Sequence, residues 1–456
     1  MLNIHWKISR RSQINFYLTL TITLFLLGSC SVQKQIAKSA DEVVLKAKAL
    51  QTAHVGISIY EPATGKYWYN YQGDKYFVPA SNTKIPTCYA AMKYLGDSLV
   101  GLRYEVEDSI VIVYGSGDPT FLHPDYSSSK ILEFLKKFRA VVLNEEKSDF
   151  GYLGFGWTSD DYLASYMAER SSIPLYGNVI KYSLENNEMN VYPKLFSRLS
   201  FDGNGGILDE FKLKSYKGLD VLRKKERNDY KITPGTQKSI LIPFHTRDYM
   251  ASDRPNFLQA QLLGDTLNMP VHPGSLLRKV QKRIIYSQPT DSLLKPMMHR
   301  SDNFFAEQSL LMVSNERLGY MNDSKIIDTI LKTDFKDLPQ KPRWVDGSGL
   351  SRYNLFTPQD FVVILDKMQK EFPMSRIKEI FPTGGEGTIS SYYKADSGFI
   401  YGKTGTLSGV VAFSGFMYTK KGKLLIFSTL INNHQASATD VRRAVEKFLQ
   451  TIRNKY

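Results

Sequence analysis

Three short clusters of residues carry side chains that could together perform acyl transfer. They are Ser81-Asn82-Thr83-Lys84, Ser301-Asp302-Asn303 and Lys403-Thr404-Gly405, and in that order they follow the patterns S-x-x-K, S-D-N and K-T-G. A hydroxyl with an amine three residues later supplies a nucleophile and a base. The second cluster supplies a proton relay, and the third supplies a cationic receptor for an anion. Such a set can activate a serine without a histidine.

The first pattern is common, and only its surroundings distinguish Ser81. S-D-N and K-T-G each occur once, whereas S-x-x-K occurs six times. Pro79-Ala80 precede Ser81 and mostly apolar residues follow Lys84, which predicts a turn that opens into a buried helix with both side chains on one face. By itself Ser81 would be a helix-capping serine near a surface lysine, but the three patterns in order favour catalysis. The other five matches, which lack this setting, begin at Ser31, Ser127, Ser292, Ser375 and Ser391.

The N-terminal residues have the features of an export signal. Basic residues precede the apolar run 16–27, and Gly28-Ser29-Cys30 close it, which predicts a signal peptide over residues 1–29. The residues before Cys30 also resemble a bacterial lipobox, in which the cysteine is acylated and becomes the first residue of the mature protein. The alternative is an ordinary signal peptide with a chance cysteine. We expect an exported, periplasmic protein that is anchored to a bacterial membrane by lipid on Cys30.

Composition narrows the class of protein. With 456 residues, of which 42% are hydrophobic, the chain can bury the cores of at least two domains. In an exported protein, the net charge of +14 favours anionic wall polymer or lipid headgroups over nucleic acid, although solubility is a simpler explanation. Cys88 is the only cysteine besides Cys30, so we expect no intrachain disulfide and a buried Cys88. The seven histidines are scattered, so we expect neither a catalytic metal nor a cofactor.

Strand-like runs near the two ends of the chain could complete one antiparallel sheet. These runs are rich in β-branched and aromatic residues. They are His54–Glu61, Lys66–Tyr71, Phe399–Leu407, Val410–Tyr418 and Lys423–Ile431. We expect the Ser81 helix and an amphipathic helix from about Ala438 to Arg453 to cover this sheet. The sheet would bring Lys403 beside Ser81, although the two lie 322 positions apart.

The spacing of the clusters predicts an insertion. Ser81 and Ser301 are separated by 220 positions, whereas Ser301 and Lys403 are separated by 102. Because all three clusters must converge, we expect an α+β fold whose catalytic domain is interrupted by one or more smaller domains. The expected parts are the signal peptide (1–29), a lipid-anchored leader (30–52), the catalytic domain (53–95 and 291–456) and the inserted domain or domains (96–290).

Over most of its mature sequence, the chain resembles the D-alanyl-D-alanine carboxypeptidase/endopeptidase family, the class C low-molecular-mass penicillin-binding proteins. Gly156-Trp157 with Asp160-Asp161 is similar to the inserted region of that family, whereas Ser172–Asn178 departs from it. Other similar stretches are Val78–Lys84, Gly115–Thr120, Asp346–Ser351 and Lys403–Leu407. The resemblance implies a serine β-lactamase/penicillin-binding fold, with a central antiparallel sheet flanked by helices. It also implies cleavage of D-Ala-D-Ala or cross-bridge D-amide bonds in peptidoglycan stem peptides, and covalent inhibition by β-lactam antibiotics.

The resemblance also implies roles for the residues of the first two clusters. Ser81 would attack the D-Ala carbonyl and become the acyl-enzyme ester, and Lys84 would be the base. Ser301 would relay the proton to the leaving amine, and Asn303 would hold the peptide amide or the lysine. Asp302 is expected to be structural, because S-D-N alone could cap a helix.

The third cluster is implied to bind substrate. Lys403, Thr404 and Thr406 would receive the terminal carboxylate, and the backbone N–H groups of Ser81 and Thr406 would form the oxyanion hole. Two alternatives use the same sequence differently. A β-lactamase or esterase on this scaffold would deacylate quickly, and a non-catalytic lipoprotein would only bind the cell wall.

Overall fold

The computed structural model describes residues 32–127, 129–144, 148–186, 188–202, 215–246, 256–274 and 281–456. The predicted signal peptide and Cys30, the predicted lipidation site, lie outside the described residues. Residues 32–40, at the start of the described chain, are α-helical. Within the described segments, no helix combines the length and apolar character needed to cross a membrane.

A five-stranded sheet joins the two ends of the chain, as the sequence predicted. The strand order is β14-β15-β16-β1-β2, and every neighbouring pair is antiparallel. The bounds are β1 His54–Glu61, β2 Lys66–Tyr71, β14 Ile400–Leu407, β15 Val410–Tyr418 and β16 Leu424–Asn432. All five lie within a residue of the predicted runs. Strand β14, which carries the third cluster, is an edge strand, so one side of its backbone is not paired within the sheet.

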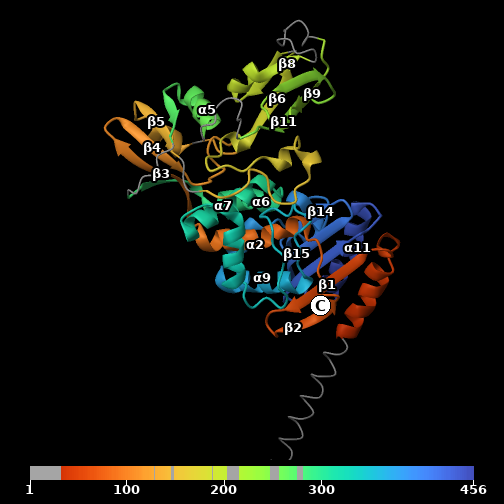
Figure 1. Ribbon diagram of the computed structural model, residues 1–456. Coiled ribbons are helices and arrows are strands. Elements are labelled where there is room, and N and C mark those ends of the chain that lie inside the picture. Colours follow the sequence, from red (N-terminus) through yellow and green to blue (C-terminus); the bar gives the residue numbers. More distant parts are fainter. Residues whose placement is uncertain are drawn as a thin grey trace, which may run out of the picture.

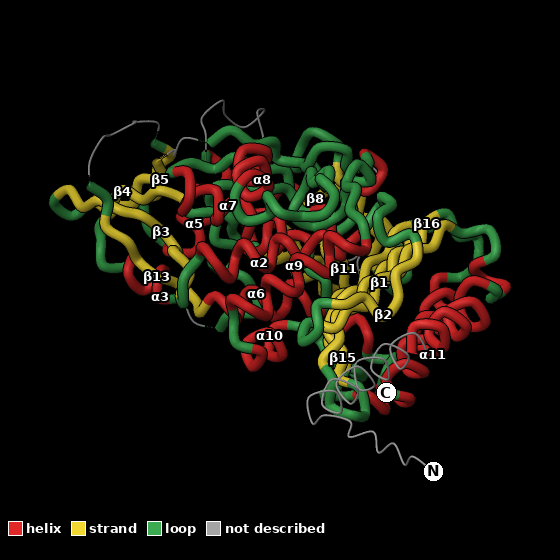
Figure 2. Tube along the Cα trace, turned by 90° about the horizontal axis from the view of Figure 1, so that it is seen from below, coloured by secondary structure: helices red, strands yellow, loops and turns green. Residues whose placement is uncertain are grey.

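Helices cover both faces of this sheet, which explains why β15 and β16 are apolar at nearly every position. Alternate residues enter different cores: Ala412 packs with α2 and α9, and Phe413 packs with α11. Figure 2 shows α2 and α9 on one side of the sheet and α11 on the other. The bounds are α2 Lys84–Tyr94, α9 Pro358–Glu371 and α11 Ala438–Lys455. Helices α2 and α11 were expected to cover the sheet, and α9 is an additional cover.

Helix α2 lies at the centre of the catalytic part. Its residues are almost all buried and share one core with the surrounding helices, which lie above and below it in Figure 1. Cys88 is fully buried in this core, and burial raises the pKa of its thiol, so it is an inert core residue as expected. The neighbouring helices are α6 Thr290–His299, α7 Asn303–Leu318, α8 Asp323–Lys332 and α10 Met374–Ile380.

The middle of the chain builds separate sheets around a second hydrophobic core. In Figure 1 these strands lie above α6 and α7, on the far side from β1 and β2. One sheet has the order β12-β5-β4-β3-β13, and two three-stranded sheets have the orders β11-β6-β7 and β8-β10-β9. The strand bounds are β3 Ser98–Glu107, β4 Ile110–Gly115, β5 Ala140–Asn144, β6 Val179–Glu185, β7 Glu188–Tyr192, β8 Ser200–Asp202, β9 Leu219–Arg223, β10 Tyr230–Pro234, β11 Ser239–Pro243, β12 Val271–Pro273 and β13 Arg283–Pro289. Two helices, α3 Lys130–Leu135 and α5 Phe257–Leu267, complete this part. On this basis we propose residues 96–290 as the insertion.

Candidate active site

Ser81 lies in a tight turn that leads into the central helix. Residues Ala80–Thr83 form a short 3-10 helix (η3), and α2 begins at Lys84, so Ser81 precedes the α-helix and does not cap it. Ala80 has a φ of 47°, a left-handed conformation that is costly for a residue with a side chain and is frequent at functional sites. Gly349 packs against this turn so closely that an added Cβ would lie 1.9 Å from the Ala80 carbonyl oxygen. The turn is therefore held by a neighbouring loop.

The Lys84 amine lies beside the Ser81 hydroxyl, as predicted from their spacing. Lys84 Nζ is 3.1 Å from Ser81 Oγ, and the same nitrogen donates to Asn303 Oδ1 at 2.6 Å and to the Ser348 carbonyl at 2.7 Å. Burial lowers the pKa of Lys84 to about 8, although the charges of nearby carboxylates oppose the shift. An amine with such a pKa can exist in the neutral form that a general base requires.

The second cluster makes a sharp turn before helix α7. Ser301 has a φ of 64°, again in the left-handed region. Asp302 caps the helix because its carboxylate accepts a backbone N–H from the first turn at 2.9 Å, which confirms its structural role. Asn303 begins the helix, and its Nδ2 donates to the Tyr166 carbonyl at 3.0 Å. Ser301 and Asn303 thereby lie on either side of a structural aspartate and line the same cavity.

Strand β14 brings Lys403 to Ser301. Lys403 Nζ lies 2.8 Å from Ser301 Oγ and 2.7 Å from the carbonyl oxygen of Thr404. The side chain of Lys403 is 0% exposed. Burial lowers the pKa of Lys403 well below its usual value, and the charge of Lys84 lowers it further. The structure places this amine on the Ser301 hydroxyl, beneath the open surface.

Gly405 allows the strand to approach the Ser81 turn. A Cβ added at Gly405 would lie 2.6 Å from the Pro79 carbonyl oxygen and 3.0 Å from the Ser81 backbone nitrogen. Both are backbone atoms that cannot rotate away, so a larger residue would push the strand and the turn apart. The third cluster therefore needs a glycine at position 405, because the edge strand is in direct contact with the Ser81 turn there.

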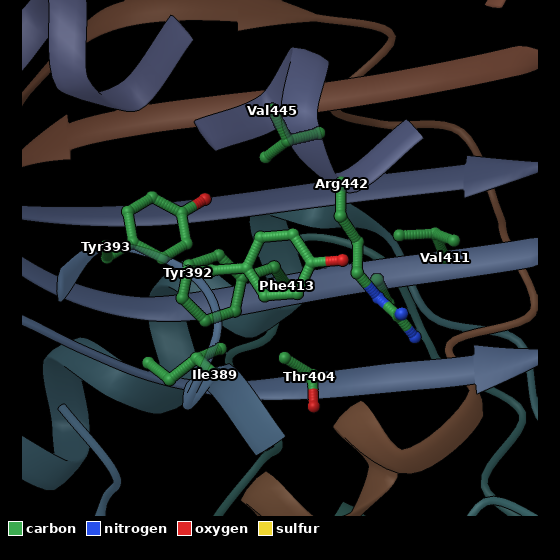
Figure 3. A pocket seen from close by; sticks show the side chains of 9 residues that line it. Ile389, Tyr392, Tyr393, Thr404, Val411, Phe413, Arg442 and Val445 are labelled. Carbon is green, nitrogen blue, oxygen red and sulfur yellow. The ribbon is translucent and has the colours of Figure 1, made fainter. Parts of the chain in front are cut away.

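Thr404 and Thr406 lie two positions apart on β14, so their side chains share one face of the sheet. Thr404 Oγ1 donates to Thr388 Oγ1 at 2.7 Å, and Thr404 lines a small hollow that also includes Arg442 of α11 (Figure 3). Thr406 is exposed and accepts a hydrogen bond from Arg442 Nη2 at 2.6 Å. Of the two threonines, Thr406 is the one that lines the cavity with Ser81.

A cavity of about 690 Å³ contains the site, a volume suited to a peptide end or a small ligand. Its wall includes residues from the middle segment, among them Trp157 and Asp161, which belong to the stretch that resembles the inserted region of the family. The complete lining is Ser81, Gly156, Trp157, Thr158, Asp161, Tyr166, Met167, Ser301, Asn303, Gly349, Leu350, Arg352, Thr406, Leu407 and Ser408. The three clusters therefore converge as predicted, at one cavity or directly beneath it.

Three buried groups support Lys84 from behind. The Ser348 carbonyl accepts from Lys84, and the Ser348 N–H donates to Glu307 Oε1 at 2.8 Å. Glu307 Oε2 pairs with Arg170 Nη1 at 3.3 Å, and Arg170 also binds Asp323 at 2.6 Å. Burial raises the pKa of Glu307 to about 7, and the charge of Arg170 opposes this shift. Ser348 lies in the stretch Asp346–Ser351, which resembles the family, whereas no local sequence pattern indicated Glu307 or Arg170.

The arrangement is chemically suited to acyl transfer. A serine hydroxyl contacts an amine whose pKa is lowered, and a second serine contacts a second buried amine. The two hydroxyls open onto the same cavity, as a nucleophile and a proton relay must.

Two relatives align along most of the chain. The D-alanyl-D-alanine carboxypeptidase of Actinomadura sp. (strain R39) is 25% identical over 453 residues, which cover 87% of this chain and 81% of the relative. The D-alanyl-D-alanine carboxypeptidase DacB of Haemophilus influenzae is 26% identical over 434 residues, which cover 85% and 87% of the two chains.

The fold has a solved counterpart. Penicillin-binding protein 4 (dacB) from H. influenzae superposes with a TM-score of 0.68 at 20% identity, over 91% of this chain and 98% of the other. This likeness confirms the predicted fold, in which a penicillin-binding core carries additional domains.

The family assignment rests on the sequence. The D-Ala-D-Ala carboxypeptidase 3 (S13) family matches residues 36–197 and 271–452. The unmatched stretch, 198–270, includes β9, β10, β11 and α5 of the middle segment, whereas Ser172–Asn178, which was expected to depart from the family, lies within the matched residues. Because the two matched stretches make up well over half of the chain, this protein belongs to the D-Ala-D-Ala carboxypeptidase 3 (S13) family.

Proposed function

We propose that this enzyme acts on peptidoglycan stem peptides as a serine D-Ala-D-Ala carboxypeptidase, a D,D-endopeptidase or both, through an acyl-enzyme on Ser81. The observation that carries the proposal is the pairing of Ser81 Oγ with Lys84 Nζ at 3.1 Å and of Ser301 Oγ with Lys403 Nζ at 2.8 Å, at one cavity. Family membership supports the substrate class, and the geometry supports the proposed roles.

In the first half of the reaction, neutral Lys84 takes the proton from Ser81 as Oγ attacks the penultimate D-Ala carbonyl. The carbonyl oxygen becomes an oxyanion, and the backbone N–H groups of Ser81 and Thr406 would stabilise it. Ser301, held by Lys403, then delivers its proton to the leaving nitrogen and takes up the proton that Lys84 removed from Ser81, so that Lys84 is neutral again. The C–N bond breaks, the terminal amino acid leaves as an amine, and an ester remains on Ser81.

In the second half, water attacks the ester with proton transfer back through the same groups, so that Ser81 and Lys84 return to their starting states. Asn303 binds the Lys84 amine through its Oδ1 and is fixed by the Tyr166 carbonyl at its Nδ2. This contact keeps the amine directed at Ser81 and supports the role of Asn303 in holding the lysine.

We further propose that β-lactam antibiotics acylate the same serine. The H. influenzae penicillin-binding protein 4 has been crystallised as a complex with a novel β-lactam, and its fold matches this one with a TM-score of 0.64 in that complex. A strained lactam placed like the D-Ala-D-Ala amide would be opened by Ser81, but its leaving group would stay tethered and hinder deacylation.

We also propose that the enzyme is exported and held at a bacterial membrane by lipid on Cys30. The predicted signal peptide and the position of Cys30 directly after its apolar run support this location. Two or more lipid chains on one residue give firm anchoring, whereas a single chain gives marginal binding.

Product analysis tests the function. The purified enzyme is incubated with disaccharide-pentapeptide and, separately, with its cross-linked dimer. Loss of a terminal D-Ala from the first substrate indicates carboxypeptidase activity, and conversion of the dimer to monomers indicates endopeptidase activity. Rapid turnover of a β-lactam with neither peptide cleaved would favour the β-lactamase alternative. The absence of both turnover and any covalent adduct would favour a non-catalytic wall-binding protein.

A further inference from the structure

The cation expected to receive the substrate carboxylate is not accessible from the cavity. Lys403 is 0% exposed, and its Nζ is already bound to Ser301 Oγ and to the Thr404 carbonyl. A carboxylate in the cavity would feel the charge of Lys403, but the amine, which already uses two of its three donors, is buried away from it. A second donor group is therefore needed where the substrate ends.

Arg442 supplies such a group at the exposed end of β14. It extends from α11 across the face of the sheet toward Thr404 of β14 (Figure 3). Its Nη2 donates to Thr406 Oγ1 at 2.6 Å, and its guanidinium lies 5.9 Å from the centre of the Tyr392 ring. Thr406 is exposed and lines the cavity with Ser81, so Arg442 reaches the rim of the active site from behind the strand.

The guanidinium of Arg442 lacks an anionic partner within the described part of the chain. Its only hydrogen bond there is to the neutral hydroxyl of Thr406. The next residue, Arg443, differs because it forms an ion pair with Glu446 and donates to the Ser391 carbonyl. Since a guanidinium carries five N–H donors in a planar fork, Arg442 keeps donors for a carboxylate while it holds Thr406.

The position of an incoming anion is limited by space. The hollow between Thr404 and Arg442 has a volume of about 20 Å³, which is room for one water molecule but not for a carboxylate. The anion must therefore lie on the outer side, next to the exposed Thr406 hydroxyl. There it can accept from Thr406 and from the adjacent Arg442 fork.

We infer that Arg442, together with Thr406, forms the receptor for the terminal carboxylate of the substrate. The inference rests on the proposed function, because it deepens the substrate recognition of the same site. Arg442 would bind substrate directly and would also fix the Thr406 hydroxyl. Charge-assisted hydrogen bonds of this kind are about twice as strong as neutral ones, so Arg442 would set the preference for a free chain end.

A second arginine, Arg352, is exposed at the cavity and offers an internal comparison. Arg352 lines the cavity and donates to the Ser408 carbonyl at 3.0 Å, beyond the end of β14 at Leu407. It comes from the loop that follows Gly349, and its hydrogen bond goes to the strand end and not to the Thr406 hydroxyl. If Arg442 receives the carboxylate, its replacement should impair carboxylate recognition. If Arg352 receives it, the replacement of Arg352 should do so instead.

The test compares two peptides that differ only at the chain end. One is an acylated peptide ending in D-Ala-D-Ala with a free carboxylate, and the other is its C-terminal amide. For Arg442→Gln we expect the kcat/KM on the acid to fall about tenfold or more and the acid-to-amide ratio to fall with it. Arg442→Lys should recover part of the ratio because the charge returns without the fork. Arg443→Gln is the matched control and should keep the wild-type ratio.

Two results would overturn the inference while the proposed function stands. These are an unchanged acid-to-amide ratio in Arg442→Gln, and a selective loss in Arg352→Gln or Arg443→Gln instead. A wild-type enzyme that cleaves neither peptide would overturn the proposed function, and the inference with it. Circular dichroism and the melting temperature of each variant separate loss of recognition from loss of fold.

Discussion

Replacing Lys84 by methionine should make the protein less sensitive to pH in a defined window. The Lys84 amine is buried, and its three hydrogen-bond partners are the neutral groups of Ser81, Asn303 and Ser348. Burial lowers the pKa of Lys84 from 10.5 to about 8, so the folded protein releases this proton more easily than the unfolded chain does. Methionine has a similar length and does not titrate.

The sign and size of the effect follow from proton linkage. Below pH 8 the lysine is protonated in both states, so stability does not depend on pH through this group. Between pH 8 and the unfolded pKa of 10.5, the unfolded chain binds more protons, so the free energy of unfolding rises with pH. From pH 7 to pH 9 the rise should be about 1.4 kcal/mol in the wild type and absent in the variant.

Urea unfolding of both proteins at pH 7 and pH 9, followed by tryptophan fluorescence, measures this difference. Subtracting the pH dependence of Lys84→Met from that of the wild type removes the contribution of titrating groups that do not interact with Lys84; Lys403, whose pKa the charge of Lys84 lowers, remains in the difference. In parallel, the rate of acylation by penicillin should rise about tenfold per pH unit below pH 8 in the wild type and level off above it. An identical pH dependence of stability in the two proteins would refute the assignment of a lowered pKa to Lys84.

Two further predictions concern residues that support the active site, and a third concerns the attachment of the protein to the membrane. Gly405→Ala should slow acylation more than about tenfold without unfolding the protein, because the new methyl group meets the backbone of the Ser81 turn. The control is Gly264→Ala, which should keep the wild-type rate of acylation, because a Cβ added there has no contact closer than 3.4 Å. Arg170→Met should lower the free energy of unfolding by about 3–5 kcal/mol because it leaves Glu307 buried without its cation; an unchanged urea midpoint would contradict that pairing. Cys30→Ala should move the protein from the membrane pellet to the soluble fraction, and a variant that stays fully membrane-bound would count against lipidation.

Sequence patterns predicted those parts of the site that depend on local spacing. Ser81 and Lys84 are three residues apart, so any helical turn brings them together, and the observed 3-10 turn does so as well as an α-helix would. The expected sheet does bring the third cluster to the Ser81 turn, where Gly405 approaches the backbone, but the contact of Lys403 with Ser301 was not predicted. The alternation of side chains along β14 also fixed which residues could share a face with Thr406.

The parts that could not be predicted depend on contacts between distant segments. Glu307 looks like an ordinary helix residue and Arg170 like an ordinary charged residue, until the fold buries both behind Lys84. Arg442 lies on an amphipathic helix where most charged residues face solvent, and only the packing of α11 on β14 directs it to Thr406. The left-handed backbone of Ser301 likewise arises from tertiary packing, since no glycine or asparagine marks it.

The central claim, acylation of Ser81, is tested most directly by mass spectrometry of the protein after incubation with benzylpenicillin. The intact protein should gain one penicilloyl group, and tandem spectra of a digest should place it on the peptide that contains Ser81. Ser81→Ala should show no adduct while its circular dichroism spectrum and melting temperature match those of the wild type. A penicilloyl group found on another serine, such as Ser292 or Ser375, would contradict the account.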